Sequence, residues 1–335
     1  MEKVNLGVIG VGRIGRLHAG NLKYQVPGVK VLAVADIFEE GSQQVASQLE
    51  IPGAEKDYRV LLENKDIDAV AICSSTDTHA QIISEAAQAG KHIFCEKPIA
   101  LDMDKIDQAI TAVKKAGVKL QVGFNRRFDP SFKKAKDLVA SGKIGTPHLV
   151  RITSRDPEPP PISYVKVSGG IFLDMMIHDF DMARYLLDQE VVELMAVGNC
   201  LVDPAIGEAG DIDTAIVTLK YEGGAWGTID NSRKAVYGYD QRIEIFGSEG
   251  CVMVGNPTPT EVIINTAKDT ISDKPLYFFI ERYQDAYLAE MEEFIKCVQE
   301  NREPSVGGLD GKISVQMGYA AKESLSKGCF VKISK

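Results

Sequence analysis

Two residues able to do acid–base chemistry, Asp174 and His178, lie four positions apart in the run Gly-Ile-Phe-Leu-Asp-Met-Met-Ile-His-Asp, residues 170–179. The pattern of residues 174–187 predicts a helix, on which positions four apart share one face. An imidazole has the intrinsic pKa of a general base near neutral pH, and a nearby carboxylate can orient a hydroxyl or stabilise the imidazolium. Taken alone, His178 is more often explained as a structural histidine. Asp and His at this spacing can also share a metal ion, but no third ligand matches, so no metal site is expected.

A glycine loop, Gly-Val-Gly-Arg-Ile-Gly at residues 10–15, follows an apolar run and opens a helical pattern. Its first glycine permits a tight turn, the second lets the backbone approach a pyrophosphate, and the third lets the helix pack on the strand. The expected contacts in this loop are Gly10, Gly12, Arg13, Ile14 and Gly15.

The choice of dinucleotide depends on Asp36, which ends the next apolar run 21 residues after Gly15. A carboxylate there can accept both ribose hydroxyls and would repel a 2′-phosphate, so NAD is expected rather than NADP. The alternative is that Asp36 is only a loop residue or a helix cap.

Polar side chains also follow two later apolar runs, residues 69–73 and 92–95. In this architecture ligands bind at the carboxyl ends of strands, so we expect further cofactor contacts from these segments. They are Ser74, Ser75, Thr76, His79, Glu96 and Lys97. Lys97 could also bond a substrate hydroxyl and relay its proton. The alternatives are a helix cap with a solvated His79 and a surface charge at Lys97.

Two domains are expected in the 335 residues. Short β-branched runs alternate with helical patterns over residues 1–123, which predicts a doubly wound, Rossmann-type parallel sheet. Residues 124–335 contain one helix, then consecutive strand patterns with tight turns, then two more helices. They predict an α+β domain with a large, mainly antiparallel open sheet.

Composition excludes several classes of protein. The chain is 44% hydrophobic with a net charge of −9 and no cluster of Lys or Arg, so nucleic-acid and acidic-membrane partners are not expected. No run approaches a membrane span and the start has no secretory signature, so a cytoplasmic protein is expected. The six cysteines are scattered without metal-ligand spacing and are expected to be reduced.

Four motifs together resemble the Gfo/Idh/MocA oxidoreductases, the superfamily named for glucose-fructose oxidoreductase, inositol dehydrogenase and a rhizopine-catabolism protein. They are the glycine loop, Cys-Ser-Ser-Thr-Asp-Thr-His at 73–79, Glu-Lys-Pro at 96–98, and residues 170–179. Ser-Arg-Asp-Pro-Glu-Pro-Pro-Pro at 154–161 and Glu-Arg-Tyr at 281–283 extend the likeness over essentially the whole chain, toward the bacterial inositol 2-dehydrogenases. This resemblance implies an NAD-binding first domain, a catalytic set of Lys97, Asp174 and His178, and a homo-oligomer, dimer or tetramer, built through the second sheet.

The expected reaction is oxidation of a polyol, with myo-inositol converted to 2-keto-myo-inositol. In this scheme His178 takes the hydroxyl proton, Asp174 orients and Lys97 relays charge. Further expected substrate contacts are Arg127, Asp156, Tyr237 and Tyr283. Each has a plain alternative: an ion pair for Arg127, a solvated loop for Asp156 and core packing for the tyrosines. Two rivals stay open, the same chemistry on scyllo-inositol or a pyranose such as glucose, and a non-catalytic dinucleotide sensor of this fold.

Overall fold

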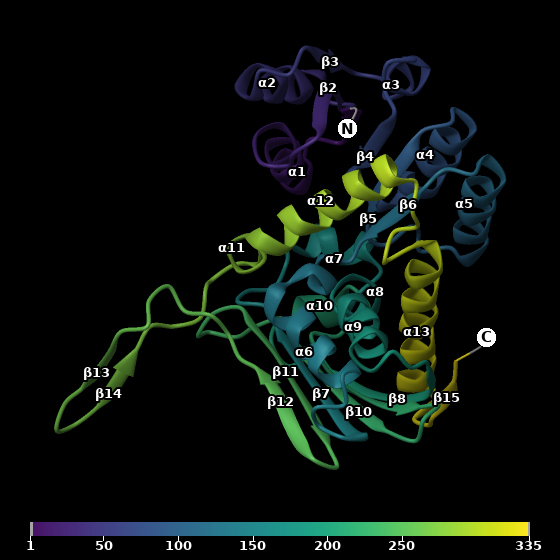
Figure 1. The fold of residues 1–335 in the computed structure, drawn as a ribbon. Helices are drawn as coiled ribbons and strands as arrows, with labels where there is room; N and C mark the ends of the chain where they lie inside the picture. The colour runs from purple at the N-terminus through teal and green to yellow at the C-terminus, as the bar shows by residue number, and fades with distance from the viewer. Residues whose placement is uncertain (1–2, 334–335) are drawn as a thin grey trace. The chain divides into compact units, whose positions relative to one another are not determined.

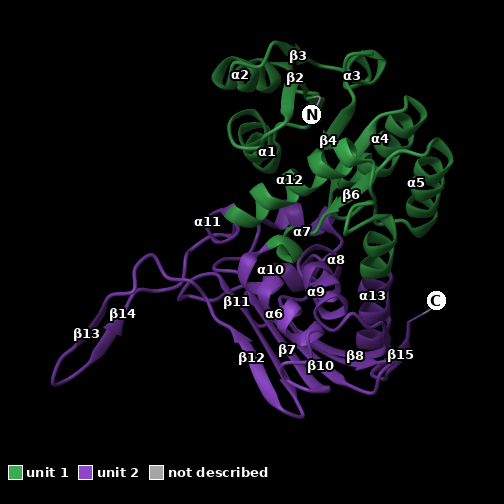
Figure 2. Cartoon of the chain, viewed as in Figure 1, with its two compact units in different colours: residues 1–128, 285–315 green, residues 129–284, 316–335 purple. Residues whose placement is uncertain are grey.

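The computed structural model describes residues 3–333, which form two compact units (Figure 2). Unit 1 runs to Phe128 and includes Asp285–Val315; unit 2 is Asp129–Gln284 with the residues from Gln316 onward. The expected division at residue 123 differs from this in two respects: residues 124–128 belong to unit 1, and residues 285–315 return to it. Among the described residues, no helix combines the length and apolar content that a bilayer span requires.

Unit 1 is built on a six-stranded sheet in the order β3-β2-β1-β4-β5-β6, in which every neighbouring pair is parallel (Figure 1). This is the doubly wound order, so the expected Rossmann sheet is confirmed. The strands are β1 (Val4–Ile9), β2 (Val29–Ala35), β3 (Gly53–Glu55), β4 (Ala69–Ile72), β5 (His92–Glu96) and β6 (Leu120–Gly123). Strand order reverses between β1 and β4, and ligands bind at such a switch point in open α/β sheets.

Helices connect the strands of unit 1 and cover its sheet. They are α1 (Arg13–Tyr24), α2 (Glu39–Leu49), α3 (Arg59–Glu63), α4 (Thr76–Gln88), α5 (Met103–Ala116), the 3-10 helix Asn125–Phe128, and α12 (Gln284–Glu300). The late helix α12 belongs here because Met291, Phe294 and Ile295 join one apolar cluster with residues of α1, α2 and the sheet. Burial of these side chains explains why α12 is part of unit 1 despite its position in the sequence.

Unit 2 is built on a seven-stranded sheet in the order β12-β11-β7-β10-β9-β8-β15. All neighbours are antiparallel except β7 and β10, which confirms the mainly antiparallel open sheet. The strands are β7 (Pro147–Arg155), β8 (Val191–Asn199), β9 (Thr214–Tyr221), β10 (Trp226–Ser232), β11 (Asp240–Gly247), β12 (Gly250–Val254) and β15 (Val331–Lys332). A separate hairpin, β13 (Ile263–Asn265) with β14 (Thr270–Ser272), is fully exposed.

The helices of unit 2 include the segment that was expected to be a single helix over 174–187. The helices are α6 (Pro130–Ala140), α7 (Ile162–Ser168), α8 (Ile171–Asp174), α9 (Ile177–Leu187), α10 (Pro204–Glu208) and α11 (Phe279–Arg282), together with the part of α13 (Gly308–Lys327) from Gln316 onward. The single-helix prediction was wrong, because α8 ends at Asp174 and α9 begins at Ile177. Ile171 O accepts from both Met175 N and Met176 N, a wide turn that interrupts the regular ladder.

Candidate active site

The glycine loop lies at the switch point of the unit 1 sheet, directly after β1. Gly10 has φ +88°, and a Cβ there would lie 2.5 Å from Ser74 N at the end of β4. A Cβ on Gly15 would lie 1.9 Å from Gly10 O, so the helix can pack this closely only without a side chain. Gly12 differs, because a Cβ there would meet no atom within 4 Å. The packing of the chain therefore requires the first and third glycines, whereas the space beside the second stays open for a ligand.

Asp36 holds the glycine loop and the start of the next segment. Its Oδ2 accepts from Val11 N at 2.8 Å, and its Oδ1 accepts from Phe38 N at 2.9 Å. Each carboxylate oxygen offers two acceptor sites, so one on each remains for ribose hydroxyls. The loop-holding role and the ribose role are thus compatible in one side chain.

The segment after β4 supplies hydroxyls and one buried imidazole. Ser74 Oγ lies 2.7 Å from Thr78 Oγ1, Ser75 precedes α4, and Thr76 is its first residue. His79 is 1% exposed, with Nδ1 2.8 Å from Pro98 O and Nε2 3.0 Å from Ser74 O. Burial lowers the pKa of this imidazole.

His79 therefore links the loop after β4 to the turn after β5. Both of its nitrogens face backbone carbonyls in the interior of unit 1. The expected cofactor contact by His79 is not supported by this geometry, and neither is a solvated side chain. Its position indicates that it fixes two segments relative to each other, both of which are expected to contact the cofactor.

The end of β5 places Glu96 and Lys97 at the carboxyl edge of the same sheet. Glu96 Oε1 lies 2.8 Å from His18 Nε2, and Lys97 follows it, half-buried. Lys97 is thus in unit 1, whereas Asp174 and His178 are both in unit 2.

In unit 2, Asp174 is held by two side chains that the sequence interpretation missed. Tyr164 Oη donates to Asp174 Oδ1 at 2.9 Å, and Arg233 Nη2 donates to Asp174 Oδ2 at 2.9 Å. Burial and the charge of Asp174 raise the pKa of Tyr164, so its phenol stays a donor at neutral pH. Asp174 is therefore fixed as an acceptor at the end of α8.

Arg233 also joins Asp174 to the proline-rich loop, because its Nη1 lies 3.4 Å from Asp156 Oδ2. The Arg233 side chain is 4% exposed, against 12% for Asp174 and 22% for Asp156. Burial would lower the pKa of Arg233, but the charges of Asp174 and Asp156 outweigh it and raise that pKa. Two carboxylates around one guanidinium leave one net negative charge at this place.

His178 is the second residue of α9 and is half-buried, close in sequence to the carboxylate that ends α8. The adjacent Asp179 is fully buried and accepts from Asn231 Nδ2 at 3.0 Å, which ties the start of α9 to β10. The start of the helix is therefore anchored beside the candidate base.

The other expected substrate residues have structural partners. Arg127 Nη2 lies 2.9 Å from Asp310 Oδ1 within unit 1, which matches the ion-pair alternative. Tyr283 is 2% exposed and packs against Phe132 and Tyr239, which matches the core-packing alternative. Tyr237 is different: it is 38% exposed, and its hydroxyl donates to Asp240 at 2.6 Å.

Two family models match the chain. A model described as "Oxidoreductase family, NAD-binding Rossmann fold" matches residues 4–124, and one described as "GFO/IDH/MocA C-terminal domain" matches residues 132–253. The open space at Gly12 and the available acceptor sites of Asp36 fit the cofactor that the first model names.

Individual relatives are similar over nearly the full length. Myo-inositol 2-dehydrogenase of Thermotoga maritima is 50% identical, over 99% of each chain. A scyllo-inositol 2-dehydrogenase (NAD(+)) of Bacillus subtilis is 39% identical, over 99% of this chain and 97% of its own. A crystal structure of a myo-inositol dehydrogenase from Corynebacterium glutamicum superposes with a TM-score of 0.94 at 37% identity, covering 99% of both chains. The chain thus belongs to the GFO/IDH/MocA oxidoreductase family, with an NAD-binding Rossmann fold in its first unit.

Proposed function

We propose that this protein is an NAD-dependent inositol 2-dehydrogenase that oxidises myo-inositol to 2-keto-myo-inositol. The observation that carries this proposal is the Asp156–Arg233–Asp174 group, whose Asp174 lies four positions before His178, in a chain 50% identical to a myo-inositol 2-dehydrogenase. Carboxylates held in place by a buried guanidinium suit recognition of neighbouring hydroxyls, since each oxygen can accept a hydrogen bond.

The reaction removes a hydride from a ring carbon and a proton from its hydroxyl, leaving a ketone. Bound NAD supplies the hydride acceptor. His178 accepts the hydroxyl proton, and Asp174, fixed by Tyr164 and Arg233, orients that hydroxyl and favours the imidazolium. Lys97 donates a hydrogen bond to the same substrate oxygen while that oxygen becomes a carbonyl oxygen. Its ammonium group thereby helps to relay the charge that develops there.

The remaining assignments follow the same scheme. Gly10, Gly12, Arg13, Ile14 and Gly15 form the pyrophosphate end of the cofactor site and Asp36 the ribose end. The segments 74–76 and 96–97 complete that site, and Asp156 accepts from polyol hydroxyls. Tyr237 is a further polyol contact in this proposal, whereas the structural partners of Arg127 and Tyr283 make those two the weakest members of the set.

We also propose that the protein is cytoplasmic and that it assembles as a homo-oligomer, a dimer or a tetramer. Support for the assembly comes from the open face of the unit 2 sheet. Strand side chains on this face that are each at least 41% exposed include Leu149, Ile216, Trp226 and Phe246. Apolar side chains exposed together on one sheet face are typical of a contact between subunits. Light scattering of the purified protein would give the number of subunits.

Initial rates of NAD reduction test the function, measured with myo-inositol, scyllo-inositol, D-chiro-inositol, glucose and xylose, and repeated with NADP. We expect myo-inositol with NAD to give the highest kcat/KM. His178→Ala is expected to lower kcat by about 10²- to 10⁴-fold, the usual contribution of a general base. A preference for scyllo-inositol, the substrate in the name of the 39% identical Bacillus subtilis enzyme, would change the proposed substrate but not the proposed mechanism. NAD binding without turnover of any polyol would favour a sensor instead.

A further inference from the structure

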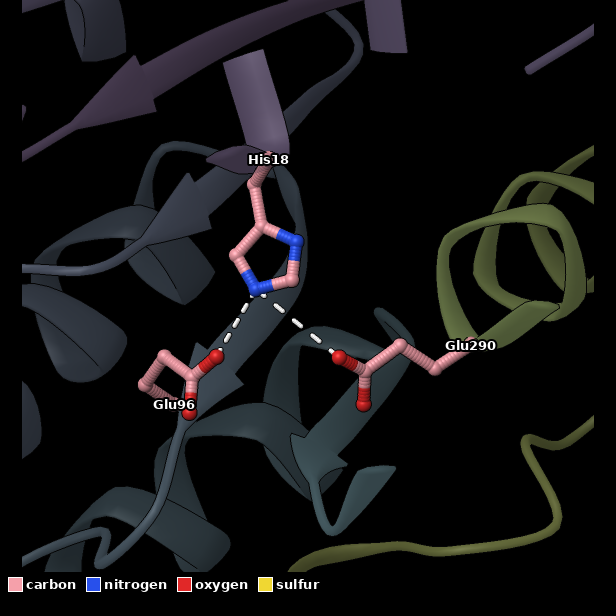
Figure 3. Close-up of side chains that lie close together, drawn as sticks. All are labelled: His18, Glu96 and Glu290. Carbon is pink, nitrogen blue, oxygen red and sulfur yellow. Dashed lines mark hydrogen bonds and ion pairs between the residues drawn. The ribbon is translucent and has the colours of Figure 1, made fainter. Parts of the chain in front are cut away.

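A buried cluster of three titratable side chains lies in unit 1, and only Glu96 of the three was among the expected site residues. His18 comes from α1, Glu96 from the end of β5 and Glu290 from α12, and their side chains point toward one another (Figure 3). His18 Nε2 lies 2.8 Å from Glu96 Oε1 and 3.8 Å from Glu290 Oε1. The side chains of His18 and Glu290 are 0% exposed and that of Glu96 is 14% exposed.

The hydrogen bonds of His18 indicate a neutral ring. In the tautomer whose Nε2–H donates a hydrogen bond to Glu96 Oε1 at 2.8 Å, Nδ1 is the nitrogen without a hydrogen. Nδ1 is buried and has no hydrogen-bond partner among the described residues. An imidazolium would place a second N–H there without an acceptor, which is unfavourable in the interior. The rings of Phe94 and Tyr287 pack against the His18 ring at steep angles, with ring centroids 5.2 and 5.7 Å away, and make its surroundings largely apolar.

With His18 neutral, the two carboxyl groups decide the charge of the cluster. Neither oxygen of Glu290 has a hydrogen-bond partner among the described residues, although both are buried. A buried carboxylate needs several donors, and a second negative charge beside Glu96 would add repulsion. His18, a shared donor at 3.8 Å, is the one ion-pairing group in reach of Glu290 within the described chain.

We propose that Glu290 is an uncharged carboxylic acid in the folded protein and acts as a positioning residue, leaving a single negative charge on Glu96. Burial and the charge of Glu96 raise the pKa of Glu290 well above its ordinary value, which agrees with this assignment. The titratable groups that face Glu290 from the packed elements are His18 on α1, Glu96 on β5 and the thiol of Cys73 after β4. Burial and the charge of Glu96 raise the pKa of Cys73, so the thiol is neutral as well.

The carboxylate of Glu96 is clamped from two sides, by His18 of the cluster and by β6. His18 bonds Oε1, and a Cβ on Gly123 of β6 would come within 3.0 Å of Oε2, so β6 forms a close wall there. The helix that supplies Glu290 is itself fixed, since Gln121 Nε2 of β6 donates to Glu290 O at 2.7 Å. Because Lys97 directly follows Glu96, the clamp holds the backbone from which Lys97 extends. This last step rests on the proposed function, which gives Lys97 its contact with substrate.

A divalent metal is the alternative occupant, because ligand atoms of the three side chains all lie within 4.8 Å of one another. The separation of 2.8 Å between His18 Nε2 and Glu96 Oε1 is that of a hydrogen bond. Two ligands of a tetrahedral zinc, each about 2.0–2.2 Å from the ion, would lie about 3.3–3.5 Å apart. The distances thus favour a proton between these atoms, and the experiment below includes the metal as an outcome.

The proton on Glu290 can be measured through the pH dependence of stability. Folding raises the pKa of this carboxyl group. Above the ordinary pKa of 4.5, the group has therefore lost its proton in the unfolded chain but still binds it in the folded protein. The contribution of Glu290 to stability is therefore greatest below that value and falls as pH rises toward the folded pKa. Between the unfolded and the folded pKa of Glu290, the folded protein binds one more proton than the unfolded chain. The equilibrium constant for unfolding therefore rises about tenfold per pH unit in this range.

Urea unfolding between pH 5 and 8 compares wild type with Glu290→Gln, a neutral side chain of the same shape. We expect the two to be similar near pH 5, and the variant to be increasingly more stable than wild type toward pH 8, because it has no proton to lose. Glu292→Gln is the matched control, a half-buried residue of the same helix, and should follow wild type. A Glu290→Gln protein less stable than wild type at pH 8 would show that the carboxylate is required and would overturn the proposal. Stoichiometric metal in the purified wild type, lost in this variant by elemental analysis, would overturn it equally.

Steady-state kinetics test the positioning role separately. Glu290→Gln should retain kcat and both KM values within about threefold, whereas Glu290→Ala, assayed where it is folded, should lose at least about tenfold in kcat with KM for NAD little changed. Full activity of folded Glu290→Ala would exclude positioning. If no polyol is oxidised by wild type, the proposed function fails, but the unfolding series still reports the proton on Glu290.

Discussion

Arg233 shows how one side chain can organise a polar site. It is buried, it bonds Asp174 from one nitrogen and approaches Asp156 from the other, and it lies directly beyond β10. A planar guanidinium can bridge two carboxylates in a fixed geometry, which an ammonium cannot. The residue therefore sets both the charge and the separation of two groups that we assign to the polyol.

We expect Arg233→Gln to lower stability by about 2–4 kcal/mol, because it leaves two partly buried carboxylates without their cation. It should also raise KM for the inositol more than KM for NAD. The matched control is Lys134→Gln, since Lys134 is an exposed cation on α6 of the same unit and its replacement is expected to change stability by no more than about 0.5 kcal/mol. Urea unfolding and steady-state kinetics measure both effects; equal losses in the two variants would refute this view of Arg233.

At the level of residues, sequence reasoning reached the chemistry that local patterns carry. The glycine spacing, Asp36 after its strand and the pair Asp174 and His178 are all visible in short windows. Arg233 is not, because its partners lie 77 and 59 positions away and nothing in Ser-Arg-Lys marks it. Glu290 is hidden for the same reason, since only the folded chain brings α12 to β5.

At the level of elements, the strand β7 and the break between α8 and α9 were not predicted. β7 lies between β10 and β11, but only two of its three buried inward positions are apolar, Val150 and Ile152, and the third is Ser154, so the apolar alternation that predicts a strand is short. The break at Met175 and Met176 has no glycine or proline to announce it. Both features depend on tertiary packing. The strands of unit 1, in contrast, are short apolar runs that can be recognised directly in the sequence.

The three glycines of the loop after β1 should separate folding from cofactor binding. Gly15→Ala is expected to destabilise the protein, because a Cβ at 1.9 Å from Gly10 O forces the helix from the strand. Gly12→Ala should melt near the wild-type temperature, since its Cβ meets nothing within 4 Å, but bind NAD at least about tenfold more weakly because the backbone can no longer approach the pyrophosphate. Thermal unfolding and NADH titration provide the comparison. Normal NAD affinity in Gly12→Ala would place the pyrophosphate elsewhere.

At the level of the whole molecule, the apolar core of unit 1 brings together residues that are two hundred positions apart in the sequence. Phe294 of α12 is fully buried, with its ring centroid 6.0 Å from that of Phe94 in β5. We expect Phe294→Ala to lower the free energy of unfolding by about 3–5 kcal/mol, the usual loss for a buried phenylalanine. Lys296→Ala, two residues along and exposed, should change it by no more than about 0.5 kcal/mol. Urea unfolding followed by circular dichroism distinguishes the two, and a small loss in Phe294→Ala would mean that α12 is dispensable to that core.

The return of the chain from unit 2 to unit 1 and back also governs how the protein can mature during its synthesis. A nascent chain that has reached Phe128 has all six strands of the first sheet but not the helix whose Met291, Phe294 and Ile295 complete its core. Unit 2 is also incomplete at that stage, because it needs the late helix α13. In that helix Gly318 lies against Leu173, and Ser324 Oγ accepts a hydrogen bond from Ala196 N at 2.9 Å. Neither unit can close before α12 and α13 have left the ribosome, so both expose apolar surface until then. We therefore expect both units to depend on chaperones and to be sensitive to C-terminal truncation, rather than the second half of the chain alone.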